Sequence, residues 1–181
     1  MNAAANGEAA GALPGGALVS APRTVVVRLG GEILALAAEA GGRIVEIESC
    51  TPVPTGPGHL IGLGNAQGVI LAVVDARRVL GLSESPWKWP ILAKIVGNEE
   101  LRLALAIDEV LGLEALDAGR IDPPGRELAE TLRPFCLGSF ESSAGRALVL
   151  DVARVIEKLQ EERSAGISPP LKRRPAAWSK V

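Results

Sequence analysis

Apolar residues come in short runs along the chain, and most runs end at a glycine or at a cluster of polar turn residues. The first two runs, TVVVRLG and EILALAA, meet at Gly30-Gly31 and predict a β-hairpin. Six later runs have a similar length and similar turn signals. The predicted strands are residues 24–30, 32–38, 59–64, 68–75, 91–96, 101–108, 135–140 and 146–151.

The segments between these runs predict connections and helices. RIVEI at 43–47 fits either one helical turn or a short strand, and the TPVPTGPG segment that follows holds three prolines, which exclude a central strand. ARRVLGL predicts a helical turn that Gly81 stops. Asp151 can cap a closing helix that ends near Arg163. The apolar stripe of this helix is Val152, Val155, Ile156 and Leu159.

About eight short strands and one clear helix predict a mainly β fold of small β-barrels, not alternating βαβ units. The loop SPWKWP at 85–90 divides the chain, and residues 117–134 form a long surface connection. We expect a disordered Ala/Gly-rich tail at 1–22, a folded domain at 23–163 and a basic flexible tail at 164–181.

Composition and charge narrow the possible functions. The chain has three Trp, two Phe and no Tyr, so its core must be built from Val, Leu, Ile and Ala. Residues 23–163 carry 15 basic and 20 acidic side chains, whereas 164–181 carry four basic residues and no acid. The net charge of −2 predicts no binding of nucleic acid.

The sequence shows no membrane or export signal. No apolar run is long enough to span a bilayer, and residues 1–22 lack the basic residues of a signal peptide. We therefore expect a cytoplasmic protein with no direct membrane insertion. Cys50 and Cys136 are then expected to be reduced thiols in or near the core, and a single disulfide between them is the less favoured alternative.

Gly62, Gly64 and Gly68 raise the question of a dinucleotide-binding loop. That loop needs G-x-G-x-x-G between a strand and a helix, with an acidic residue about 20 positions later. Here the spacing is G-x-G-x-x-x-G, a β run follows Gly68, and Asp75 lies only seven residues beyond it. The glycines and Asn65 therefore predict a tight hairpin turn, not a cofactor site.

The remaining reactive side chains do not form a catalytic or metal-binding set. His59 is the only histidine; it has no evident nucleophile or orienting partner, and we expect it in a loop or at the surface. An alternative is a small enzyme that uses Cys50 or Cys136 as its nucleophile, which would require a depressed thiol pKa.

Tryptophans stand in two unusual places. Trp87 and Trp89 fit two roles about equally well, as exposed anchors of an interface or as a plug over the gap between two barrels. Trp178 lies in the basic tail, where it favours peptide-like docking onto a partner.

Four segments resemble the CheW-like family of chemotaxis coupling proteins, and they follow the family's order along the chain. HLIGLGNAQGVILAVVDARRVLGL is similar to the family signature I-x-G-x-x-N-L-R-G-x-V-x-P-V-V-D-L-R. IVEIESCTPVP, LRLALAIDEVLGLEAL and FCLGSFESSAGRALVLDVARVIEKL are similar to its V-x-E-I segment, its V-D-x-V strand, and its closing hairpin and helix. The resemblance covers about residues 23–160. The matching residues are Ile61, Gly62, Asn65, Gly68, Val69, Val73, Val74, Asp75, Arg77, Ile107, Asp108 and Val110.

The resemblance implies two five-stranded SH3-like barrels side by side with a C-terminal helix. It also implies an adaptor with no catalytic activity and no cofactor. Such an adaptor joins the cytoplasmic tips of chemoreceptors to a sensor histidine kinase, whose regulatory domain has the same fold, and reaches the inner membrane through receptor arrays. The family's partner-binding groove maps onto Ile44, Glu46, Ile47, Gly62, Asn65, Gln67 and Gly68.

Most of these residues also have a purely structural explanation. Ile44 and Ile47 are of a type that is more often buried than exposed, and Glu46 is by default a solvated acid. Gly62 and Asn65 can serve turn geometry alone.

Three positions depart from the family pattern. Gln67 stands where the family has an arginine that is associated with partner contacts, Ala66 before it replaces a leucine, and Ala72 replaces a proline. The first change favours an alternative function, a regulatory or decoy module that binds only one of the two partners. It also suggests a specialised paralogue for another receptor system, such as surface motility. Asp75 keeps the family residue and is expected mainly to cap the helical turn after it.

Overall fold

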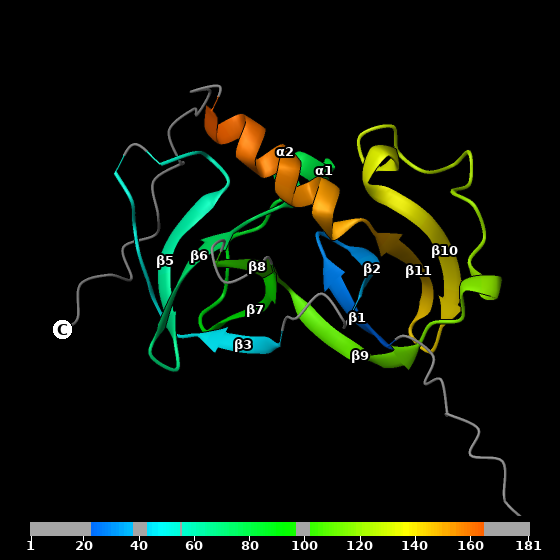
Figure 1. The fold of residues 1–181 in the computed structure, drawn as a ribbon, viewed down its shortest axis with the longest axis horizontal. Coiled ribbons are helices and arrows are strands. Elements are labelled where there is room, and N and C mark those ends of the chain that lie inside the picture. Colours follow the sequence, from blue (N-terminus) through cyan, green and yellow to red (C-terminus); the bar gives the residue numbers. More distant parts are fainter. Residues whose placement is uncertain (1–22, 38–42, 55, 97–101, 165–181) are drawn as a thin grey trace, which may run out of the picture.

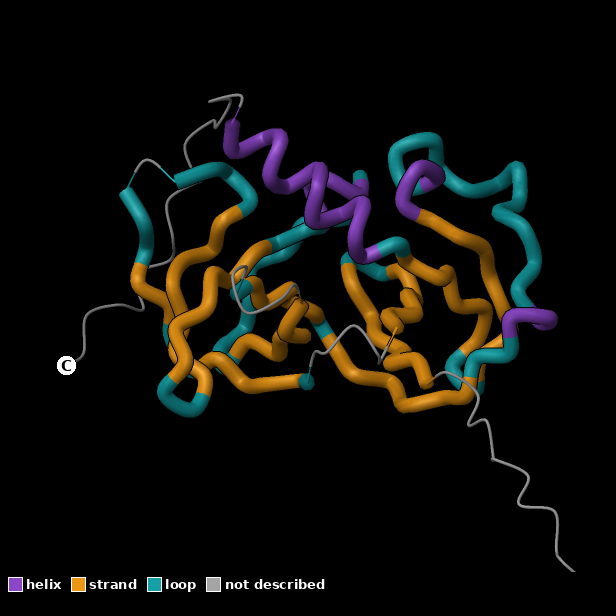
Figure 2. Tube along the Cα trace, viewed as in Figure 1, coloured by secondary structure: helices purple, strands orange, loops and turns teal. Residues whose placement is uncertain are grey.

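The structure is a computed structural model that describes residues 23–37, 43–54, 56–96 and 102–164. Within these ranges eleven strands form two curled sheets that lie side by side, and one long helix crosses above both (Figures 1 and 2). This confirms the predicted fold class. The predicted tails at 1–22 and beyond Ser164, and the predicted turn at Gly97-Asn98, lie outside the described residues.

The first sheet takes strands from both ends of the described chain, and we call it the terminal barrel. Its strands are β1 (Arg23–Leu29), β2 (Glu32–Ala37), β9 (Glu109–Ala115), β10 (Cys136–Ser142) and β11 (Gly145–Leu150), in the order β10-β11-β2-β1-β9. β1–β2 and β10–β11 are the predicted first and last hairpins. The two hairpins meet where β11 runs parallel to β2, with Leu148 beside Leu34.

The second sheet is continuous in sequence, and we call it the central barrel. Its strands are β3 (Ile44–Ile47), β4 (Cys50–Thr51), β5 (Leu60–Ala66), β6 (Val69–Val74), β7 (Ile91–Val96) and β8 (Leu103–Ile107), in the order β3-β7-β8-β6-β5-β4. The sixth strand, β4, has only two residues and pairs with the edge of β5.

Both predicted helices are present. They are α1 (Arg77–Leu80) and α2 (Val152–Ser164), and two short 3-10 turns lie at η1 (Ala118–Arg120) and η2 (Arg133–Phe135). α1 ends at Gly81, whose φ of 69° suits a residue without a side chain. At the start of α2, the Asp151 Oδ1 atom accepts a hydrogen bond from the Arg154 backbone N–H at 3.1 Å, which is the predicted cap.

Residues 43–47 had two possible interpretations, and the structure has the short strand, β3, which pairs antiparallel with β7. Two details differ from the expectation. β9 was not predicted, since Glu109, Gly112 and Glu114 interrupt its strand pattern; it pairs with β1 across a register shift. The loop 85–90 does not divide the fold, because β6 and β7 on either side of it belong to the same barrel.

Three apolar clusters hold the fold, and the largest lies between the barrels and under α2. Two smaller clusters fill the interiors of the central and terminal barrels. Val25 and Val27 face the large cluster while Val26 faces the interior of the terminal barrel, so both faces of β1 are buried. Members of the large cluster include Val25, Val27, Leu29, Leu34, Leu36, Val74, Leu103, Leu105, Ile107, Val152, Val155 and Leu159.

A buried guanidinium stands at the junction of the barrels. Arg77 is 2% exposed, and its Nη2 atom donates to Asp75 Oδ2 at 2.6 Å. Its Nη1 atom donates to Ser85 Oγ at 3.2 Å and lies 3.6 Å from Asp108 Oδ1. The guanidinium carbon lies 3.8 Å from the centre of the Trp87 ring. We call these five residues the junction cluster.

The junction cluster connects both barrels. Asp75 Oδ1 accepts a hydrogen bond from the Arg77 backbone N–H at 3.0 Å, so Asp75 caps α1 as expected. Asp75 Oδ2 also accepts one from Trp87 Nε1 at 3.0 Å. Asp108 Oδ2 accepts one at 2.7 Å from the backbone N–H of Gly30, in the β1–β2 turn of the terminal barrel.

The two tryptophans of the loop differ. Trp87 is partly buried and packs against the large cluster and against the interior cluster of the central barrel, which is the plug role. Trp89 is 38% exposed and is the more exposed of the two.

We expect Arg77→Met to destabilise the protein by roughly 3–5 kcal/mol, because the substitution leaves two partly buried carboxylates without their cation. Arg28 offers a control: it pairs with Glu109 at 3.1 Å, and the two side chains are 41% and 57% exposed. Arg28→Met should therefore cost less than about 1 kcal/mol. Urea unfolding measures both values. Equal losses in the two variants would contradict the importance of the junction cluster.

Candidate partner-binding site

The β5–β6 hairpin ends in a two-residue turn that displays Gln67. Ala66 and Val69 are the last paired residues, and the turn residues Gln67 and Gly68 have φ values of 53° and 84°. Positive φ at both positions suits the right-handed twist of a hairpin, and glycine reaches it without strain. Asn65 Oδ1 accepts a hydrogen bond from the Gly68 backbone N–H at 2.8 Å, which holds the turn closed.

Gln67 is free to meet a partner. It is exposed, and its side chain has no hydrogen bond within the described part of the chain. Its positive φ is the only one that the described residues show outside glycine, and such a backbone costs on the order of 1–3 kcal/mol. The turn therefore combines a strained backbone with an exposed side chain at the position where the family pattern has arginine.

The β3 residues of the predicted groove divide between the core and the surface. Ile47 is fully buried in the interior cluster of the central barrel, and Ile44 is partly buried against the large cluster. Glu46 is exposed between them. Ile47 can therefore affect a partner only through the position of β3, whereas Glu46 can make contact directly.

Gly62 serves the close approach of β4 to β5. It is buried, and a Cβ atom added to it would lie 2.6 Å from the Thr51 carbonyl oxygen and 2.9 Å from Cys50 Cβ. Gly64 has the same role toward β3, because its Cβ would lie 2.6 Å from Ile47 Cγ2. The second contact also shows that β3 and β5 lie side by side, so the structure brings these parts of the predicted site together.

Two exposed apolar residues on the same hairpin were not among the predicted site residues. Leu63 is 42% exposed and Ile70 is 54% exposed. Leu63 pairs with Ala72 and Asn65 pairs with Ile70, so both apolar side chains stand on the outer face of the sheet. The alternation of Leu63 and Asn65 with Gly64 and Ala66 was the available signal.

His59 is not a surface residue. It lies in the turn before β5, as one expectation had it, but it is only 6% exposed, because α2 packs beside it. Its Nδ1 atom lies 3.4 Å from Glu162 Oε2, outside hydrogen-bond geometry, and has no hydrogen bond within the described ranges. Burial lowers the pKa of His59, against the weaker opposing effects of Glu162 and Asp75.

The cysteines do not resemble nucleophiles. Both are buried, as expected, and neither forms a disulfide. Burial raises the pKa of the Cys136 thiol, which is the opposite of activation. Across the described residues, no group of three His, Cys, Asp or Glu side chains is placed to hold a metal ion.

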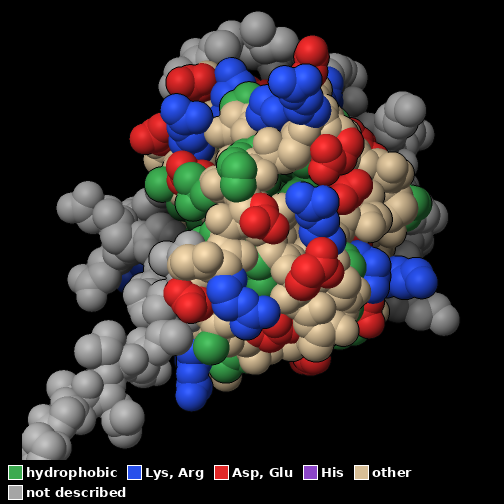
Figure 3. Space-filling view, turned by 90° about the vertical axis from the view of Figure 1, so that its right-hand side faces the viewer, with side chains coloured by type: hydrophobic (Ala, Val, Ile, Leu, Met, Phe, Trp, Pro, Cys, Tyr) green, Lys and Arg blue, Asp and Glu red, His purple; other side chains and the backbone are tan. Residues whose placement is uncertain are grey.

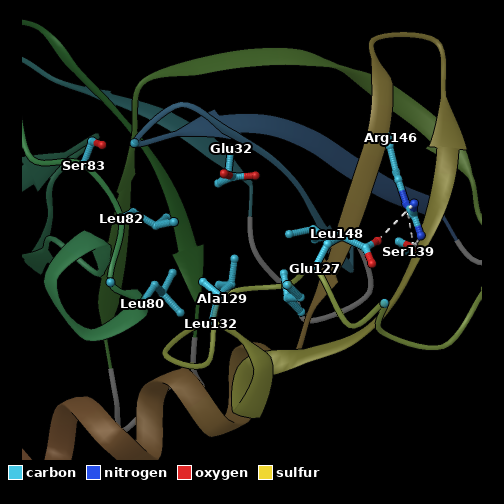
Figure 4. A pocket seen from close by; sticks show the side chains of 14 residues that line it. Glu32, Leu80, Leu82, Ser83, Glu127, Ala129, Leu132, Ser139, Arg146 and Leu148 are labelled. Atoms are coloured by element: carbon cyan, nitrogen blue, oxygen red, sulfur yellow. Dashed lines mark hydrogen bonds and ion pairs between the residues drawn. The ribbon is translucent and has the colours of Figure 1, made fainter.

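A cavity of about 430 Å³ lies away from the hairpin, between the terminal barrel, α1 and the loop before η2 (Figure 4). Leucines such as Leu80, Leu82 and Leu148 line much of it. Three of its polar residues contact one another: Arg146 donates from Nε and Nη2 to Ser139 Oγ at 3.1 and 3.0 Å and lies 3.4 Å from Glu127. These contacts do not form a nucleophile–base pair.

The terminal barrel presents a mixed surface. Figure 3 faces this end of the molecule and shows Lys and Arg side chains intermixed with Asp and Glu, without a broad patch of one sign on that face. None of the helices in the described ranges is long and apolar enough to cross a membrane.

These features define a mainly β protein of two SH3-like barrels, which are joined by the junction cluster and crossed by one helix. The family model of the CheW-like domain matches residues 23–160, so the chain belongs to the CheW-like domain family, as the sequence resemblance predicted. The crystal structure of the scaffolding protein TtCheW from Thermoanaerobacter tengcongensis has a similar fold. Its TM-score is 0.60 at 22% identity, and the match covers 72% of this chain and 84% of that chain. A search of curated proteins finds no match.

We expect Gly62→Ala to destabilise the protein by roughly 1–3 kcal/mol, because the added methyl group meets backbone atoms that cannot move freely. Gly112 in β9 is the control, since a Cβ there meets nothing within 4 Å. Gly112→Ala should be neutral or stabilising by a few tenths of a kcal/mol to about 1 kcal/mol. Thermal unfolding compares the two, and a Gly62→Ala protein as stable as the parent would contradict the close approach of β4.

The buried His59 should make stability depend on pH. Its folded-state pKa lies below the ordinary value of 6.5, so the unfolded chain binds the proton more readily. The free energy of unfolding should therefore fall as the pH drops below about 6.5 and be restored above it. His59→Gln should reduce this dependence between pH 5 and 8. An unchanged pH profile in urea unfolding would argue against the buried neutral histidine.

Proposed function

We propose that this protein is a non-catalytic adaptor of a chemosensory pathway and that it works by binding alone. The observation that carries the proposal is membership of the CheW-like domain family over residues 23–160. The protein of similar fold, TtCheW, is described as a scaffolding protein. The raised pKa of Cys136 and the buried position of Cys50 give no support to a thiol enzyme.

The partners we propose are the regulatory domain of a sensor histidine kinase and the cytoplasmic tip of a chemoreceptor. Receptor arrays would then hold the protein at the inner membrane. The proposed contact surface comprises the exposed Glu46 on β3 and the hairpin residues Asn65, Gln67 and Gly68. A receptor tip is helical in this proposal, and a helix can lay an apolar stripe against the partly buried Ile44 on β3.

A second candidate is a regulatory module that binds only one of the two partners. The specific observation in its favour is Gln67, which is exposed at the turn where the family pattern has a cation. Loss of a charge there weakens one complex and leaves the other intact if only one partner contacts the turn.

Titration calorimetry with each partner domain separates the two candidates. We expect the unmodified protein to bind both at about micromolar affinity, which is typical of transient signalling contacts. Gln67→Arg should strengthen the contact that uses the turn, and Gln67→Glu should weaken it by roughly fivefold, or about 1 kcal/mol. Glu157 is exposed on α2, away from the hairpin, so Glu157→Ala should change neither affinity.

The outcomes are distinct. Binding to both partners supports the adaptor, and binding to one supports the regulatory module. No binding to either overturns both candidates. Equal effects of Gln67→Glu and Glu157→Ala would remove the turn from the proposed surface.

A further inference from the structure

The outer face of the β5–β6 hairpin carries an apolar strip that the fold does not cover. Leu63 and Ile70 form its centre, and Val53, at 37% exposure, lies two residues beyond Thr51, which pairs with Leu63. Three of the seven large apolar residues that are exposed in the described structure thus gather on one hairpin and the segment beside it. Such a grouping on a small domain marks a surface that another group covers.

The last turn of α2 ends close to this strip. Glu162 Oε2 lies 3.4 Å from Nδ1 of His59, the residue that precedes β5. In Figure 1 the C-terminal end of α2 lies above the side of the molecule that holds β5. Residues that follow Ser164 therefore leave the domain beside the start of the hairpin.

The length of the following segment is more than sufficient to reach the strip. Leu63 stands four residues after His59, which is about 13 Å along a strand. Trp178 stands 14 residues after Ser164, a distance of up to about 46 Å when extended. The segment can therefore place its tryptophan on the strip with slack to spare.

The charges of the two surfaces are complementary. Residues 165–181 contain Lys172, Arg173, Arg174 and Lys180 and no acidic residue. Glu46 and Glu48 are exposed on β3 and just before β4, at the side of the barrel where β3 adjoins β5. Neither glutamate has an ion pair among the residues that the structure describes.

From these observations we infer that residues 165–181 of the same chain dock onto this strip. Trp178 covers Leu63 and Ile70, and the basic residues approach Glu46 and Glu48. A segment on a short tether is present at an effective concentration of about a millimolar, so even a weak contact is well populated. The docked segment lies beside the Gln67 turn and competes with any partner that uses that turn.

The test uses the full chain and the indole N–H signals of its three tryptophans in a two-dimensional ¹⁵N–¹H NMR spectrum. Trp178→Phe assigns the Trp178 signal. We expect Ile70→Ser to move this signal to the position seen in a peptide of residues 165–181. Leu113→Ser is the matched control, because Leu113 is also 54% exposed but belongs to the terminal barrel. Leu63→Ser serves as a second variant if Ile70→Ser fails to fold.

A Trp178 signal that responds to Ile70→Ser and not to Leu113→Ser supports the docking. A weakening of the response in high salt adds support for the charge contribution. A signal already at the free-peptide position in the parent chain overturns the inference, as does an equal response to both variants. A response that grows with protein concentration also overturns it, because it would assign the contact to a second copy. The measurement needs no partner, so it stands apart from the proposed function.

Discussion

The arrangement of the two barrels depends on one buried cation. Arg77 is the first residue of α1, forms ion pairs with Asp75 and Asp108, and lies over the ring of Trp87. A guanidinium that is 2% exposed is tolerated only because its donors are matched by acceptors from several chain segments. Apolar burial brings the barrels together, but it has no direction of its own. The hydrogen bonds of this cluster supply the geometry that sets how they meet.

The apolar cluster between the two barrels is larger than the cluster inside either barrel. β1 is apolar on both faces because one face fills its barrel and the other packs against the neighbouring barrel. β8 behaves in the same way, with Ala104 and Ala106 facing inward and Leu103, Leu105 and Ile107 facing the space between the barrels. Small residues inside and large ones outside suit a narrow barrel interior.

Local signals in the sequence were sufficient to predict the first and last hairpins, the two helices and the Gln67 turn. Gly30-Gly31, Asn65 with Gly68, and the stripe on α2 each act within a few residues, which is the range that pattern analysis covers. Local patterns could not assign the strands to their barrels, because the pairing of β11 with β2 joins residues far apart in sequence. The same holds for Asp108, whose partners lie in the β1–β2 turn and in α1.

The candidate site was predictable only in part, and for the same reason. The resemblance located the hairpin and β3, and the turn chemistry of Asn65 followed from residue types. Residue type alone does not predict which side chains face solvent, because Ile47 is buried whereas Ile70 is exposed. Burial depends on which strands lie alongside, and a β-strand does not carry that information in its own sequence.

The split construction of the terminal barrel has a consequence for how the chain folds during synthesis. The central barrel uses residues 44–107 and is complete before residues 108–164 are made. β1 and β2 are made first, yet their sheet lacks β10 and β11 until residue 150 has emerged. During synthesis the β1–β2 hairpin therefore keeps an unpaired strand edge. Nascent chains with such edges tend to aggregate or to bind chaperones. Among the described strands, β1 and β2 therefore spend the longest time without all of their neighbours.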